Sequence, residues 1–110
     1  MSNLKNVIQA EKNKDNCDSV ILSIVIPSYN SEKLLSRCIN ALENQSAKKA
    51  FFEIAIADDG SNDETLEMLG TFKSRSELNL QWTNIKNSGP ATARNTGISI
   101  SSGIWIGFLD

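Results

Sequence analysis

Polar residues that could bind a ligand follow separate apolar segments of this sequence. Asp58 and Asp59 stand side by side after the apolar run at 51–57, and Ser28-Tyr29-Asn30 follows the run at 20–26. Adjacent carboxylates repel one another unless a hydrogen-bond donor, a cation or a helix amino terminus stabilises them. Such an acid could accept the imide N–H of a uracil or a ribose hydroxyl. Taken alone, the segment after the first run is explained equally well by a turn and helix cap, and for the acidic pair ordinary capping is the favoured explanation.

Two further residues could take part in the same chemistry. Arg94 lies in the small-residue segment Ala93-Arg94-Asn95-Thr96-Gly97, where it could bind a phosphate or a carboxylate. Asp110 follows the apolar run at 104–109, where a buried strand would end. Both have an ordinary alternative, since an arginine in a helix is usually solvated and an aspartate can simply cap a strand.

The composition excludes several other classes of site. The sequence has no histidine, so it holds no Ser-His-Asp triad and no HExxH zinc helix. A net charge of -2 gives no basic surface for a nucleic-acid backbone. Cys17 and Cys38 form neither a CxxC pair nor a zinc ligand set, so we expect free thiols. No GxGxxG or P-loop motif is present, which disfavours a simple dehydrogenase or NTPase.

Alternating strands and helices must position these residues. Apolar patterns predict strands at 20–26, 51–57, 79–85 and 104–109. Helical patterns predict helices from Ser31, the expected cap, to about Gln45, over 65–76, and from Pro90 to about Ser101. This order predicts an α/β fold: a Rossmann-like, mostly parallel sheet with helices on both faces. The run at 79–85 is less hydrophobic than the others, so its strand is expected at the edge of the sheet. Residues 1–19 are expected to be a separate polar segment ahead of a domain at 20–110.

Segments in this order closely resemble glycosyltransferase family 2. They are SIVIPSYN at 23–30, ADDGSNDET at 57–65, NSGPATARNTG at 87–97 and FLD at 108–110. The resemblance covers about residues 20–110 and implies the amino-terminal half of a GT-A fold, which binds the nucleoside diphosphate of an activated sugar. The sequence departs from the family pattern at two places: Ala57 replaces a more usual valine, and Asn62-Asp63-Glu64 replaces a more usual Thr-Asp-Gly. Neither change affects a residue that the resemblance implies as a ligand.

The resemblance also implies site residues. Those implied to bind the nucleotide are Pro27, Ser28, Tyr29, Asp58, Asp59, Arg94 and Asp110. Asp59 is the better candidate for the base. Asp110 matches the first acid of a D-x-D motif that holds ribose and a divalent Mg²⁺ or Mn²⁺, and the second acid is absent. No catalytic residue is expected in these 110 residues, because the base and the acceptor-binding half of such enzymes lie later in the chain.

The implied function is transfer of a sugar, with inversion, from a nucleotide-diphosphate sugar, with UDP the expected carrier, to an acceptor hydroxyl. The residues by themselves leave open a non-catalytic α/β nucleotide-binding or interaction module. We expect these 110 residues alone to hold no metal stably, to transfer no sugar and to self-associate through an apolar edge at 104–108. The resemblance also suggests polysaccharide synthesis in the cytoplasm, at the inner face of the membrane in the intact protein.

Overall fold

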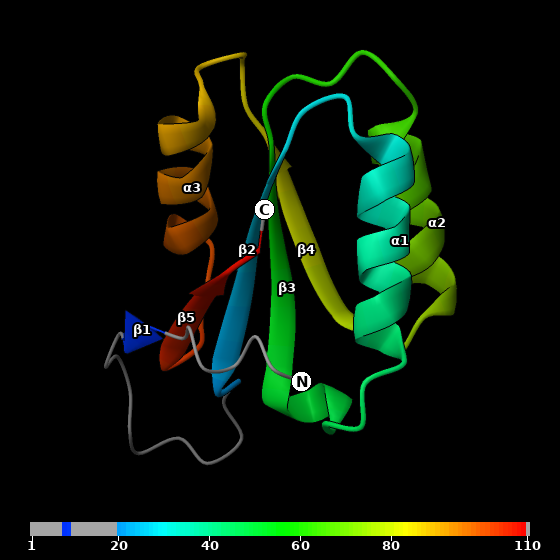
Figure 1. Cartoon of the computed structure of the whole chain (residues 1–110), viewed down its shortest axis with the longest axis vertical. Helices are drawn as coiled ribbons and strands as arrows, with labels where there is room; N and C mark the ends of the chain where they lie inside the picture. The colour runs from blue at the N-terminus through cyan, green and yellow to red at the C-terminus, as the bar shows by residue number, and fades with distance from the viewer. Residues whose placement is uncertain (1–7, 10–19, 110) are drawn as a thin grey trace.

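The computed structural model describes residues 8–9 and 20–109 as a sheet between two layers of helices. Its elements are β1 (Ile8–Gln9), β2 (Leu22–Ser28), α1 (Glu32–Glu43), the short 3₁₀ helix η2 (Lys49–Phe51), β3 (Phe52–Asp58), α2 (Thr65–Arg75), β4 (Asn79–Asn84), α3 (Pro90–Ser99) and β5 (Trp105–Phe108). Helices α1 and α2 lie on one face and α3 on the other (Figure 1). The predicted α/β fold with helices on both faces is therefore confirmed.

The strand order is β1-β5-β2-β3-β4, so β4 is an edge strand as predicted. The four longer strands run parallel, and β2 pairs with both β3 and β5. Strand β2 runs to Ser28, beyond the predicted end at Ile26. Pro27 is tolerated inside this strand because β5 pairs with β2 only as far as Val25, which leaves one side of Pro27 outside the ladder.

The amino-terminal segment contributes one short strand to the sheet. Ile8 pairs with Ile106 and Gln9 with Trp105, so β1 extends the sheet antiparallel to β5. The expectation of an open edge along 104–108 is therefore wrong at the two paired residues, because a short strand completes their backbone hydrogen bonding. Cys17 and Asp110 lie outside the described residues.

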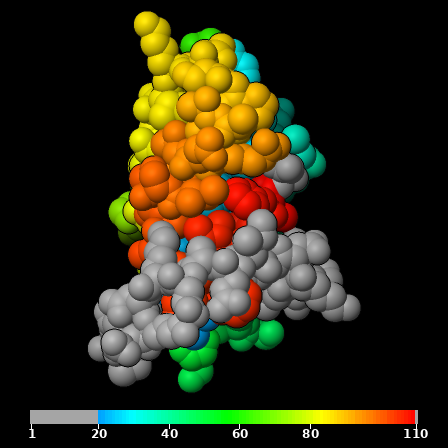
Figure 2. Space-filling model, turned by 90° about the vertical axis from the view of Figure 1, so that its left-hand side faces the viewer, coloured from blue at the N-terminus to red at the C-terminus, as the bar shows by residue number. Residues whose placement is uncertain are grey.

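Apolar side chains pack on both faces of the sheet. The larger core lies between the sheet and helices α1 and α2, where Ile39, Ile54 and Leu69 are fully buried. On the other face, α3 lies so close to the sheet that a Cβ at Gly97 would be only 2.4 Å from Cγ1 of Val25. The absence of a side chain at Gly97 therefore allows α3 to lie close to the sheet. Figure 2 shows α3 on this face, beside β5.

Parallel pairing brings the carboxyl ends of β2, β3 and β4 to one edge of the sheet (Figure 1). The loops that follow these strands are therefore neighbours. Gly60 allows this approach with a φ of 81°, and a Cβ there would lie 3.2 Å from the backbone nitrogen of Asn87. Among the described residues, no helix has the length and apolar character needed to cross a membrane.

Candidate functional site

A pocket of about 250 Å³ lies at the carboxyl edge of the sheet. It is lined by Pro27, Ser28, Tyr29, Asp59, Pro90, Ala93 and Arg94. The lining residues come from the end of β2 and its following turn, the turn after β3, and the first turns of α3. The fold thus gathers Pro27, Ser28, Tyr29, Asp59 and Arg94, all named from the sequence, around one space.

The carboxylate of Asp59 is buried, with 6% of the residue exposed, and is held by the loop before α3. Oδ1 accepts the backbone N–H of Ser88 at 2.6 Å, and Oδ2 accepts that of Gly89 at 3.0 Å. These bonds compensate for the burial of its charge. Because a carboxylate offers about four lone-pair positions, each oxygen can still accept a hydrogen bond from a ligand.

The turn after β2 supplies an aromatic ring and a buried hydroxyl. Tyr29 is 43% exposed, so its ring offers a surface for stacking. Ser28 is only 5% exposed, and its Oγ has no hydrogen-bond partner within the described part of the chain. A buried hydroxyl without a partner is costly, and a polar group of a bound ligand could supply one.

Helix α3 brings positive charge to the pocket. It begins with Pro90 at its first turn, as predicted, and Gly89 before it has a φ of 97°. Arg94 follows one turn later and is half-buried. The guanidinium and the positive amino end of the helix dipole both favour an anionic ligand. The pocket therefore joins one carboxylate, one guanidinium, an aromatic ring and an unpaired hydroxyl.

Among the described residues named from the sequence, Asp58 does not line the pocket. Asp58 is fully buried, and both of its oxygens accept hydrogen bonds from Ser61. Asp110 lies outside the described residues. Within the described ranges no group of three or more acidic or cysteine side chains could hold a metal ion. Since Mg²⁺ is bound through several oxygen ligands, the described side chains by themselves do not form such a site.

Contacts between the first two loops were not foreseen from the sequence. The backbone N–H of Asn30 donates to Oγ of Ser61 at 2.8 Å, and Asn30 Oδ1 accepts the N–H of Asn62 at 2.7 Å. Asp63 accepts the N–H of Glu32, the first residue of α1, at 3.3 Å. Their only sequence signal is that Asn, Asp and Ser are common in turns.

The predicted cap of α1 is wrong in its chemistry. Ser31 does occupy the position before the helix, but it makes no side-chain capping bond. Its hydroxyl instead donates to the backbone oxygen of Tyr29 at 2.9 Å. The carboxylate of Asp63, which is far from Ser31 in sequence, accepts the first helical N–H in its place.

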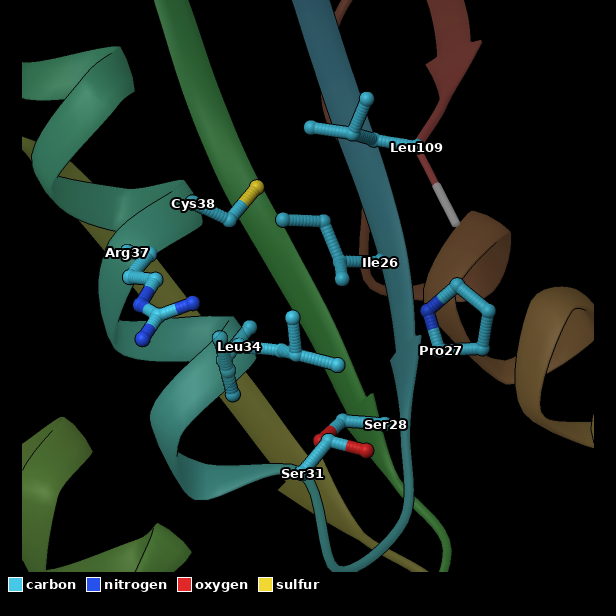
Figure 3. A pocket seen from close by; sticks show the side chains of 9 residues that line it. Ile26, Pro27, Ser28, Ser31, Leu34, Arg37, Cys38 and Leu109 are labelled. Atoms are coloured by element: carbon cyan, nitrogen blue, oxygen red, sulfur yellow. The ribbon is translucent and has the colours of Figure 1, made fainter.

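A second cavity, of about 430 Å³, lies beside the first on the α1 side of β2 (Figure 3). Its lining is mostly apolar and comprises Ile26, Pro27, Ser28, Ser31, Leu34, Leu35, Arg37, Cys38 and Leu109. Burial raises the pKa of the Cys38 thiol, so it stays protonated at neutral pH and is a poor nucleophile. Cys38 is half-buried and packs against the core.

Most of this chain can be matched to known proteins. The model of the family described as Glycosyl transferase family 2 matches residues 23–110. A poly(ribitol-phosphate) beta-glucosyltransferase of Bacillus spizizenii is 42% identical over 90 residues, which are 81% of this chain and 14% of that protein. The minor teichoic acid biosynthesis protein GgaA of Bacillus subtilis is 42% identical over 93 residues, which are 82% of this chain and 21% of that protein.

Solved structures share the fold. The crystal structure of residues 1–349 of TarS from Staphylococcus aureus, in complex with UDP-GlcNAc, matches with a TM-score of 0.77 and 33% identity. The match covers 83% of this chain and 26% of that one. The chain thus spans between 14% and 26% of the length of these relatives.

Proposed function

Because this chain belongs to glycosyltransferase family 2, we propose that the pocket at its sheet edge binds the nucleotide of a UDP-sugar donor. The observation that carries this proposal is the gathering of Tyr29, Asp59 and Arg94, from separate loops, around one pocket. Support for uridine comes from the similar TarS structure, which was solved in complex with UDP-GlcNAc.

Each lining group has a role that its chemistry allows. The exposed ring of Tyr29 stacks against the base. Asp59, with a free lone pair on each oxygen, accepts the imide N3–H of uracil. The unpaired hydroxyl of Ser28 bonds to a polar atom of the nucleoside, and Arg94 balances phosphate charge.

For the intact enzyme we propose inverting transfer of a sugar to an acceptor hydroxyl. Relatives named for poly(ribitol-phosphate) and teichoic acid favour a cell-envelope polymer as the acceptor. The proposed cofactor is Mg²⁺ or Mn²⁺, with Asp110 as the ligand that the family resemblance implies within these residues. The catalytic base and the acceptor contacts belong to residues outside this chain.

Titration with UDP, CDP, GDP and ADP tests the nucleotide site. Cytosine carries no proton at N3, so CDP lacks the imide N–H that uracil would donate to Asp59. An unsatisfied buried acceptor costs about 1–3 kcal/mol, so UDP should bind roughly fivefold to a hundredfold more tightly than CDP. Calorimetry measures the affinities, and NMR shifts should centre on Tyr29, Asp59 and Arg94. Equal affinities for UDP and CDP, or shifts far from these residues, would contradict the proposal.

A further inference from the structure

We propose that Asp58 is a positioning residue of the nucleotide site, and that it acts through Ser61 and Asn30. This inference rests on the proposed function. We call these residues the clasp. It joins the loop after β2, which carries Tyr29, to the loop after β3, which carries Asp59.

The first half of the clasp is the bond between Asp58 and Ser61. Asp58 is 0% exposed, and a buried carboxylate must be hydrogen-bonded. Its Oδ1 accepts the hydroxyl of Ser61 at 2.5 Å, and its Oδ2 accepts the backbone N–H of Ser61 at 3.0 Å. The hydroxyl has a single proton, which it gives to Asp58, so its lone pairs face away from that carboxylate.

The second half is the bond from Ser61 to the neighbouring loop. The Ser61 hydroxyl accepts the backbone N–H of Asn30 at 2.8 Å. Asn30 has a φ of 46°, a left-handed conformation that asparagine adopts more readily than most residues. Its Oδ1 accepts the N–H of Asn62 at 2.7 Å. The loop after β3 therefore holds the residue that follows Tyr29 in this left-handed conformation.

The two adjacent acids consequently hold different loops. Asp59 binds the backbone of Ser88 and Gly89 and lines the pocket, whereas Asp58 binds Ser61 and does not. Successive residues at a strand end point in different directions, which allows this division. Without the clasp, the loop carrying Tyr29 would be free to shift relative to Asp59, and a misplaced contact group weakens binding even when it is present.

Substitution of Ser61 tests the clasp. Ser61→Ala removes the hydroxyl that bridges Asp58 and Asn30, and Ser61→Thr keeps it. Asn62→Ala is the matched control, because Asn62 enters this network through its backbone N–H. The loss of this bridge, in which the hydroxyl donates to Asp58 and accepts from Asn30, should lower UDP affinity about twofold to tenfold in Ser61→Ala. Both Ser61→Thr and Asn62→Ala should bind UDP as the unaltered protein does.

Amide hydrogen exchange separates this inference from the proposed function. Exchange at the Asn30 N–H should be about twofold to tenfold faster in Ser61→Ala and unchanged in Ser61→Thr. If the unaltered protein does not bind UDP, the proposed function fails, while exchange still tests the clasp. Unchanged exchange or unchanged UDP affinity in Ser61→Ala would overturn the inference.

A second variant, Asn30→Gly, tests the clasp if Ser61→Ala does not fold. Glycine accepts the positive φ and removes the Oδ1 that binds Asn62. This variant should also bind UDP about twofold to tenfold more weakly. UDP affinity equal to that of the unaltered protein would contradict the clasp independently of Ser61.

Discussion

At the end of β3, two aspartates that are identical in sequence character have different partners. Asp58 is enclosed by Ser61, and Asp59 faces the pocket while holding the amides of Ser88 and Gly89. The difference depends on which loop each carboxylate meets. An acidic pair of this kind should therefore be tested one residue at a time.

Replacement of Asp59 by alanine should weaken UDP binding more than it weakens binding of inorganic pyrophosphate, because the lost contact is to the base. The expected loss for UDP is about 1–3 kcal/mol, since the imide N–H loses its acceptor. Calorimetry with both ligands measures the difference. Glu77→Ala is the control, because Glu77 is exposed and lies outside the pocket. A loss of only a few tenths of a kcal/mol in the free energy of UDP binding would argue against the role assigned to Asp59.

At the scale of elements, a buried carboxylate fixes the connection between α3 and β5. Glu53 in β3 is 2% exposed, and its Oε2 accepts the hydroxyl of Ser23 at 2.5 Å and the N–H of Ser102 at 2.6 Å. Its Oε1 accepts Nε2 of Gln81 at 3.0 Å. Ser23 in turn accepts the N–H of Gly103 at 2.7 Å. This network therefore ties three strands to the chain that enters β5.

Glu53→Ala should destabilise the fold, because it leaves these donors buried without an acceptor. The expected loss in free energy of unfolding is about 1–3 kcal/mol or more, and Glu53→Gln, which keeps one oxygen, should lose less. Urea unfolding measures both, with Glu67→Ala on the exposed face of α2 as the control. If Glu53→Ala were as stable as the control, the network would not hold this connection in place.

For the whole molecule, the dependence of stability on pH follows from a composition without histidine. No imidazole titrates between pH 5 and 8, so stability should change little there. The hydroxyl of Thr65 is the main cause that lowers the pKa of Asp63 from 3.8. The unfolded chain then takes up the proton first as the pH falls. The contribution of Asp63 to folding stability is therefore fully present above the pKa that it has in the unfolded chain. This contribution is lost as the pH falls through the lower pKa of the folded state.

Asp63→Ala should accordingly be less stable than the unaltered protein at pH 7, and the two should converge as the pH falls below about 4. Thermal unfolding across this range measures the gap. Asn62→Ala, in the same exposed loop, should follow the unaltered protein at every pH. A gap that widened in acid would show that Asp63 does not stabilise the fold as a carboxylate.

The sequence by itself determined the α/β class, the helices, the edge position of β4 and the sheet edge where the polar residues gather. These follow from local apolar patterns and from the rule that parallel strands end on one side. The family was also readable, because motifs such as PSYN at 27–30 and DDGS at 58–61 occur in a fixed order.

Only the tertiary structure decided which partner each polar group meets. The bond from Asn30 to Ser61 spans 31 residues, and that from Ser102 to Glu53 spans 49, so no local pattern could indicate them. The pairing of β1 with β5 likewise joins distant segments. Side-chain roles at this site are set by packing between loops far apart in the chain, whereas strands and helices are set by periodicity within a few residues.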